Sequence, residues 1–183
     1  LDSAPRRRLA LIDAIAAAAR HAPLPAGVAR RAFFRAYLRG VDDDDLVARD
    51  PATLARTAIA HLQFGRRRRR GETLVSVFNP RRSTHGFDSS ATFVAIVTDD
   101  MPFLVDSLGI AFTARGVSVQ MLVHPVLEAP RDRTGRLQAL RLAGPQGVES
   151  AAPRESWQLY EVDRLHEPDA LQGLEAALRQ TLA

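Results

Sequence analysis

Five consecutive residues combine two carboxylates with the start of a predicted helix: Asp99, Asp100, Met101, Pro102 and Phe103. A helix N-terminus attracts carboxylates because its first N–H groups have no partner within the helix. The Asp99 carboxylate could receive an α-amino group, so both ends of an amino acid would find a partner here. The simpler alternative is that Asp100 only caps the helix.

The longest run of one charge, Arg66–Arg70, could contact phosphate groups. A sheet covered by helices can resemble an RNA-recognition fold, but such folds stack bases on aromatic side chains of their central strands. Phe93 is the only aromatic residue in the strand predicted over residues 91–97, and the strand predicted over 117–127 has none. The sequence therefore favours a solvated loop, or a contact with an acidic protein surface, and we expect no nucleic-acid partner.

No other group of residues predicts chemistry. His85 and His124 lack carboxylate partners at the spacing of a metal site, and Asp42–Asp45 lacks the Gly and the distal Glu of a calcium loop. No GxGxxG motif is present to bind the pyrophosphate of a dinucleotide, and no serine lies in a nucleophile elbow. We therefore expect no catalytic, metal-binding or cofactor-binding residue in this chain.

The composition indicates one domain of ordinary size with a helical extension. All 25 basic residues are Arg, and there is no Cys, which fits a reducing compartment. No apolar run approaches the roughly 20 residues that cross a bilayer, and Leu1–Arg8 lacks the apolar block of a secretory signal. We expect a cytoplasmic protein without membrane contact.

The first 70 residues are predicted to be helical because their apolar residues recur at helical spacing. Gly40 and Gly65 are expected to end two of these helices, and Asp50-Pro51 has the pattern of an N-cap followed by proline in the first turn. The helices are expected over residues 7–20, 25–39, from 42–45 onward, and from 51 to Gly65.

Residues 71–183 alternate between strand and helix patterns, which predicts an antiparallel sheet covered by helices on one face. The apolar run at 91–97 predicts a buried central strand. Asp100 is the expected cap of the helix at 102–115, and an irregular or mobile connection is expected over 143–154. Strands are also expected over 73–78, 117–127, 136–142 and 157–162, a loop over 81–90, and a last helix from Pro168 that continues past Ala183.

The segment TDDMPFLVDSL (Thr98–Leu108), followed by ARGVSV (Ala114–Val119), resembles the ACT-domain pattern of strand, Asp-x-Pro turn, helix, Gly and strand. Together with VFNP at Val77–Pro80, this wording is similar to the N-terminal region of the large bacterial NAD-specific glutamate dehydrogenases. The resemblance covers about residue 33 to the end. The helical pattern over 1–70 therefore precedes an ACT-like (ferredoxin-like) α/β domain, which the resemblance implies over 71–183.

The resemblance implies that the parent enzyme oxidises L-glutamate to 2-oxoglutarate and ammonia with NAD, in a dehydrogenase domain far C-terminal to this region. ACT-like modules of the family are thought to serve regulation and assembly. The implied partners are other domains and subunits of a homo-oligomeric parent enzyme, and a small amino-acid effector is the alternative. Glutamate dehydrogenases use lysines at their active site, and this chain has no Lys.

Two departures from the ACT pattern bear on ligand binding. The family turn usually has Gly after its Pro, where this chain has Phe103, whose ring is expected to fill the space of an effector. The usual strand after the second helix is also missing. Two explanations are open: the chain ends before that strand, or residues 157–162 take its place in the sheet.

Overall fold

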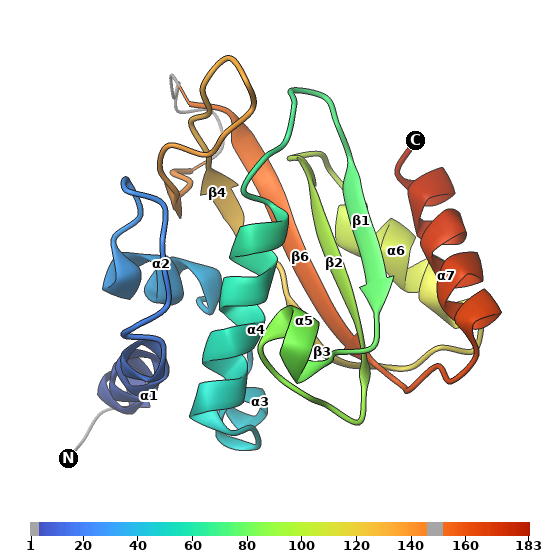
Figure 1. Cartoon of the computed structure of the whole chain (residues 1–183), viewed down its shortest axis with the longest axis horizontal. Helices are drawn as coiled ribbons and strands as arrows, with labels where there is room; N and C mark the ends of the chain where they lie inside the picture. Colours follow the sequence, from blue (N-terminus) through green and yellow to red (C-terminus); the bar gives the residue numbers. More distant parts are fainter. Residues whose placement is uncertain (1–3, 146–151) are drawn as a thin grey trace.

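The computed structural model describes residues 4–145 and 152–183, which form a layered α+β structure (Figure 1), so the predicted fold class is confirmed. Of the connection predicted over 143–154, residues 146–151 lie outside the described residues. The helices are α1 (Ala4–Ala18), α2 (Arg30–Tyr37), α3 (Asp43–Val47), α4 (Pro51–Phe64), α5 (Arg82–His85), α6 (Leu104–Thr113) and α7 (Pro168–Thr181). The strands are β1 (Leu74–Phe78), β2 (Thr92–Asp99), β3 (Val119–Val123), β4 (Val126–Glu128), β5 (Arg141–Leu142) and β6 (Arg154–Val162).

The strands form one six-stranded antiparallel sheet in the order β1-β2-β6-β4-β5, with β3 also paired to β6. The predicted strand at 117–127 is divided into β3 and β4 by His124 and Pro125. β2 lies between β1 and β6, and every residue from 92 to 98 is buried. This position explains its nearly continuous apolar sequence, because neither of its faces meets water.

On the side away from β6, the neighbour of β2 is a strand that precedes it in the chain. Strand β1 pairs with β2 from Leu74 opposite Val97 to Phe78 opposite Phe93. The expectation that residues 157–162 could take the place of a strand after the second helix is wrong. Those residues belong to β6, which pairs with the other edge of β2. The ACT-like sheet therefore obtains its edge strand from the segment before it.

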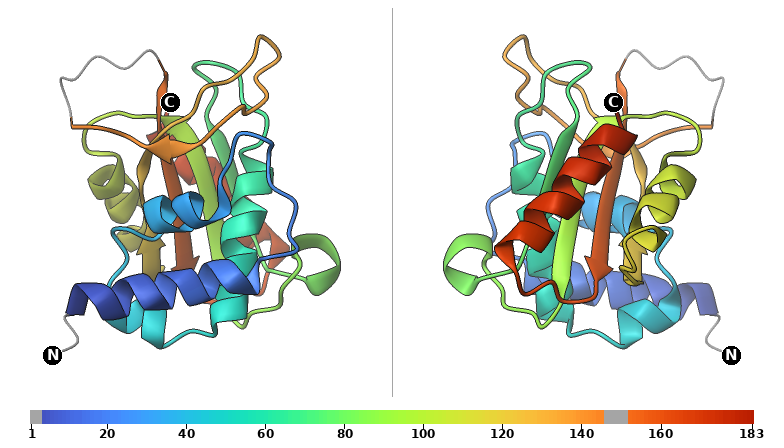
Figure 2. Two further views of the ribbon diagram at one scale, coloured as in Figure 1. Left: turned by 90° about the vertical axis from the view of Figure 1, so that its left-hand side faces the viewer. Right: turned by 90° about the vertical axis from the view of Figure 1, so that its right-hand side faces the viewer.

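Helices cover both faces of the sheet (Figures 1 and 2). α6 and α7 pack on one face, where Val94, Ile96 and Tyr160 belong to one hydrophobic cluster with Leu108 and Leu178. The N-terminal helices cover the other face, and the sequence did not predict this second layer. Their apolar residues form a second cluster with those of β2 and β6, so the segment over 1–70 shares a core with the sheet.

Local sequence explains most helix ends. The Asp50 carboxylate accepts a hydrogen bond from the backbone N–H of Thr53 and caps α4, as predicted. The second helix begins at Arg30, five residues later than predicted, because Gly27 forms a β-bridge with Ala139. A Cβ at Gly27 would lie 1.8 Å from the Gln138 carbonyl oxygen, so only glycine permits this approach.

The segment 81–90, predicted to be a loop, contains the short helix α5. Among the described residues, no helix is long and apolar enough to cross a membrane.

A buried histidine joins the helical layer to the sheet. The Tyr37 hydroxyl donates a hydrogen bond of 2.8 Å to Nδ1 of His61. Nε2 of the same ring donates a hydrogen bond of 3.1 Å to the Ile96 carbonyl oxygen. The neutral ring satisfies both partners. Burial lowers the pKa of His61 from 6.5 to about 4, because the charged imidazolium would lose its hydration.

We expect the free energy of unfolding to fall by about 3 kcal/mol between pH 6.5 and pH 4 through this one group. The unfolded chain binds the proton at its normal pKa while the folded chain excludes it, so the stabilisation is complete above pH 6.5 and is lost as the pH falls to about 4. Urea unfolding at a series of pH values measures this slope. His61→Asn should remove it, whereas His166→Asn, at an exposed position, should retain it. Equal slopes in the native chain and His61→Asn would contradict this account.

Candidate functional site

The residues predicted to hold an effector lie where β2 ends and the chain turns into α6. Asp99 is the last residue of β2, and α6 begins at Leu104. Asp100 does not cap the helix, so that prediction is wrong: the N-cap position belongs to Phe103, without a side-chain hydrogen bond. The Asp100 carboxylate instead lies 3.4 Å from Nε of Arg154, and its backbone N–H donates to the Arg154 carbonyl. The backbone hydrogen bonding between β2 and β6 therefore extends one residue past β2 and holds Asp100 at the end of the sheet.

Asp99 is already engaged by a cation from this chain. Its Oδ1 accepts a hydrogen bond of 2.6 Å from Nη2 of Arg68, while 45% of its side chain remains exposed. An incoming α-amino group would therefore share this carboxylate with Arg68. No pattern in the sequence predicts that these two residues, 31 positions apart, come together.

Phe103 stands in a strained and exposed position. Its φ of 63° lies in the left-handed region, the only positive φ among the non-glycine residues that the structure describes. An L-residue pays about 1–2 kcal/mol for this conformation. The ring is 76% exposed, so the expectation that it fills the space of an effector is wrong. Met101 beside it and Ile110 on α6 are also large apolar residues exposed to solvent, at 44% and 71%.

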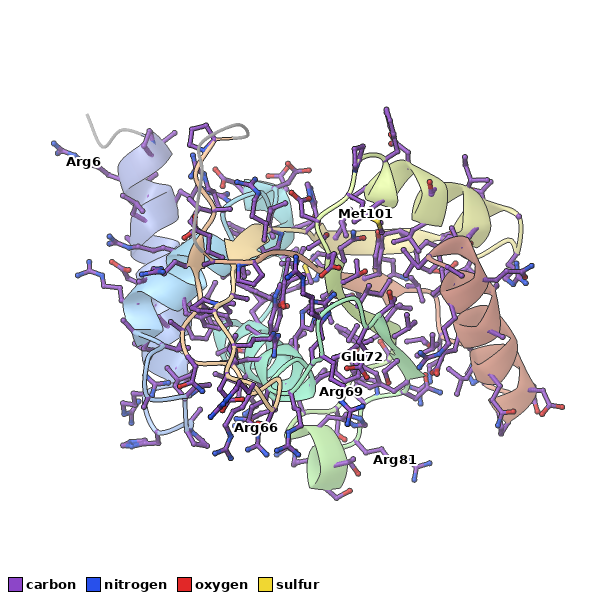
Figure 3. All side chains as sticks on the ribbon, turned by 90° about the horizontal axis from the view of Figure 1, so that it is seen from above. Arg6, Arg66, Arg69, Glu72, Arg81 and Met101 are labelled. Atoms are coloured by element: carbon purple, nitrogen blue, oxygen red, sulfur yellow. The ribbon has the colours of Figure 1, made fainter. Side chains whose placement is uncertain are left out.

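Arg68 belongs to the run Arg66–Arg70, which was expected to be a solvated loop. For Arg68 that expectation is wrong, because its side chain is only 2% exposed. Its Nη1 donates to Oε1 of the buried Glu155 at 2.8 Å, and its Nε donates to the Glu72 carbonyl at 2.6 Å. Figure 3 shows Arg66, Arg69 and Glu72 following one another along the loop before β1, with Met101 at the start of α6.

The Glu155 carboxylate is the centre of this network. Arg131 donates to both of its oxygens, from Nε at 2.7 Å and from Nη2 at 2.9 Å. Nε1 of the buried Trp157 donates to Oε2 at 3.1 Å. Asp99 lies directly opposite Glu155 in the β2–β6 pairing, where two carboxylates would repel each other. Arg68 bridges both carboxylates and turns this repulsion into attraction.

The remaining sequence-selected residues have structural environments. The His85 ring stacks on Phe78 with centroids 4.3 Å apart, and His124 is exposed. Within residues 4–145 and 152–183, no three His, Cys, Asp or Glu side chains are placed to hold a metal ion. Phe93 is 2% exposed and packs against Phe87, so it offers no platform for a base.

Comparisons with known proteins agree with the resemblance seen in the sequence. The family described as "Glutamate dehydrogenase, ACT1 domain" matches residues 33–178. The NAD-specific glutamate dehydrogenase of Halomonas elongata is 41% identical over 108 residues, which cover 59% of this chain and 7% of that protein. The NAD-specific glutamate dehydrogenase of Pseudomonas aeruginosa is 32% identical over 139 residues, covering 76% of this chain and 8% of that protein. The chain therefore spans less than a tenth of the length of these relatives, and no solved structure matches it.

We expect Glu155→Gln to lower the free energy of unfolding by about 3 kcal/mol, because the buried Arg131 guanidinium loses its ion-pair partner and the buried Arg68 guanidinium keeps only the half-exposed Asp99. Urea denaturation monitored by Trp157 fluorescence measures the change. The matched control is Asp88→Asn, which removes one carboxylate from an exposed pair with Arg82 and should cost less than about 1 kcal/mol. Similar losses of free energy of unfolding in the two variants would show that the buried Glu155 contributes no more to stability than an exposed carboxylate does.

Proposed function

Because this chain belongs to the family of glutamate dehydrogenase ACT1 domains, we propose that it is a non-catalytic regulatory and assembly domain of a large NAD-dependent glutamate dehydrogenase. The parent enzyme would be a cytoplasmic bacterial homo-oligomer that oxidises L-glutamate to 2-oxoglutarate and ammonia. NAD would bind outside this chain. The names of the relatives support this parent activity, and the absence of Lys from this sequence supports a catalytic site elsewhere.

The observation that carries the assembly role is the turn at Phe103. A residue that is strained and exposed at once does little for the stability of the isolated fold, so its strain points to a role outside it. Phe103 stands at the N-cap of α6 and Ile110 lies within that helix, and both side chains are strongly exposed. Since the matched stretches make up only 7% and 8% of the two relatives, the occupant we propose for this surface is another domain of the same enzyme.

The test compares one substitution in two settings. In the full-length enzyme, Phe103→Ser with Ile110→Ser should lower the midpoint temperature of activity loss by several degrees, because a buried contact loses its apolar side chains. In the isolated chain the same pair should leave the unfolding temperature nearly unchanged, because both side chains are already exposed.

Leu9→Ser with Val47→Ser is the matched control in the full-length enzyme, since it removes two other exposed apolar side chains. It should leave the midpoint of activity loss unchanged. Equal behaviour of the two double variants in the full-length enzyme would contradict the proposed contact.

A second candidate function is an amino-acid sensor whose pocket uses Asp99, Asp100, Met101, Pro102 and Phe103. The Asp99 carboxylate favours it, because Arg68 donates to Oδ1 while 45% of the side chain remains exposed. Calorimetric titration of the chain with a panel of amino acids tests this function. Saturable heat with one amino acid, lost in Asp99→Asn but kept in Asp88→Asn, is the expected result for a sensor. If no amino acid gives saturable heat, the sensor function is contradicted and only the assembly role remains.

A further inference from the structure

A cavity of about 460 Å³ lies between the loop before β1, the turn after β4 and the start of β6. Its lining includes five arginines: Arg68, Arg69, Arg70, Arg131 and Arg133. Three carboxylates face them, from Asp99, Asp132 and Glu155, which leaves two positive charges in excess. Cavities of this size hold small organic molecules.

The charges deep in the cavity are satisfied within the chain. Arg68 and Arg131 bind Glu155, and Arg68 also binds Asp99. The Asp132 carboxylate closes its own turn, where its Oδ1 accepts hydrogen bonds from the backbone N–H groups of Thr134 and Arg136.

The arginines at the rim are different. Arg69, Arg70 and Arg133 are exposed, and none of their guanidinium groups forms an ion pair within the part of the chain that the structure describes. The excess positive charge therefore resides on these three groups. They come from two separate loops on either side of the cavity.

The two loops are held together by backbone contacts. The N–H of Arg68 donates to the Gly135 carbonyl, and the N–H of Leu137 donates to the Arg66 carbonyl. Gly135 adopts a φ of +81°, and a Cβ there would lie 2.5 Å from the Arg68 carbonyl oxygen, so this close approach requires glycine. The rim arginines are thus brought to one opening before any ligand arrives, which lowers the entropic cost of binding.

We propose that this cavity binds a small dianion that carries carboxylate or phosphate groups. Guanidinium groups match the planar geometry of carboxylates and phosphates and bind them through paired hydrogen bonds. Two excess charges suit a dianion better than a monoanion, and the buried Arg68–Glu155–Arg131 network gives the site a fixed floor. The site is separate from the surface of Phe103 and Ile110, and its failure would leave the proposed assembly role intact.

Calorimetric titration of the 183-residue chain with inorganic phosphate and with succinate tests the proposal, and acetate serves as the monoanion control. Saturable binding of phosphate or succinate at one site, with acetate at least about tenfold weaker, is expected. The heat shows which of the two groups the site prefers. Arg70→Gln with Arg133→Gln should weaken that binding by at least about tenfold.

Arg7→Gln with Arg115→Gln is the matched control, since it removes the same charge from exposed positions outside the cavity. It should bind the dianion as the native chain does, and far-ultraviolet circular dichroism should show both double variants folded. Equal weakening in the two double variants would reduce the effect to general electrostatic attraction and overturn the site. Binding of an oligoglutamate peptide without binding of either small dianion would also overturn it, in favour of an acidic protein partner.

Discussion

The buried carboxylate of Glu155 constrains the whole arrangement. An unpaired carboxylate at this depth would cost several kcal/mol, so the chain must deliver cations to it. Arg68 arrives from the loop after α4 and Arg131 from the turn after β4, while Trp157 adds a hydrogen bond from the same strand. Arg68 also closes its own loop on the Glu72 carbonyl, two residues before β1 begins. One ion-pair network therefore sets the path from the helical segment into the first strand.

That path explains how β2 obtains its neighbouring strand on the side away from β6. β1 leaves the Arg68 loop and pairs directly with β2, and α7 then packs across it. Glu175 of α7 accepts a hydrogen bond from the Val77 N–H, and Arg179 donates to the Val75 carbonyl. These side chains occupy hydrogen-bonding groups on the outer edge of β1, which would otherwise be open to another strand. The helices before β1 cover the opposite face, so one N-terminal segment supplies both the edge strand and the second layer.

The sequence predicted the features that depend on neighbouring residues. The apolar run of β2, the Asp50-Pro51 start of α4 and the glycine after it are local patterns with local causes. The features it missed depend on distant residues. Nothing in a run of five arginines marks Arg68 as the buried one, because its burial requires Glu155, 87 residues away. Likewise, Asp100 is a residue type that often caps helices, but its pairing with Arg154 follows only from the position of β6 beside β2.

The turn at Phe103 is held from both sides, which explains how its strain persists. Asp99 is bound by Arg68 and Asp100 by Arg154, while Leu104 and Leu108 anchor the start of α6 in the core. Three residues lie between these fixed ends, Met101, Pro102 and Phe103, so the backbone has little freedom, and Phe103 adopts the left-handed conformation. Asp99 also borders the arginine-lined cavity. A dianion bound by the rim arginines would lie beside this anchor without replacing it, because Arg68 already holds Asp99 and Glu155 in the fixed floor of the cavity.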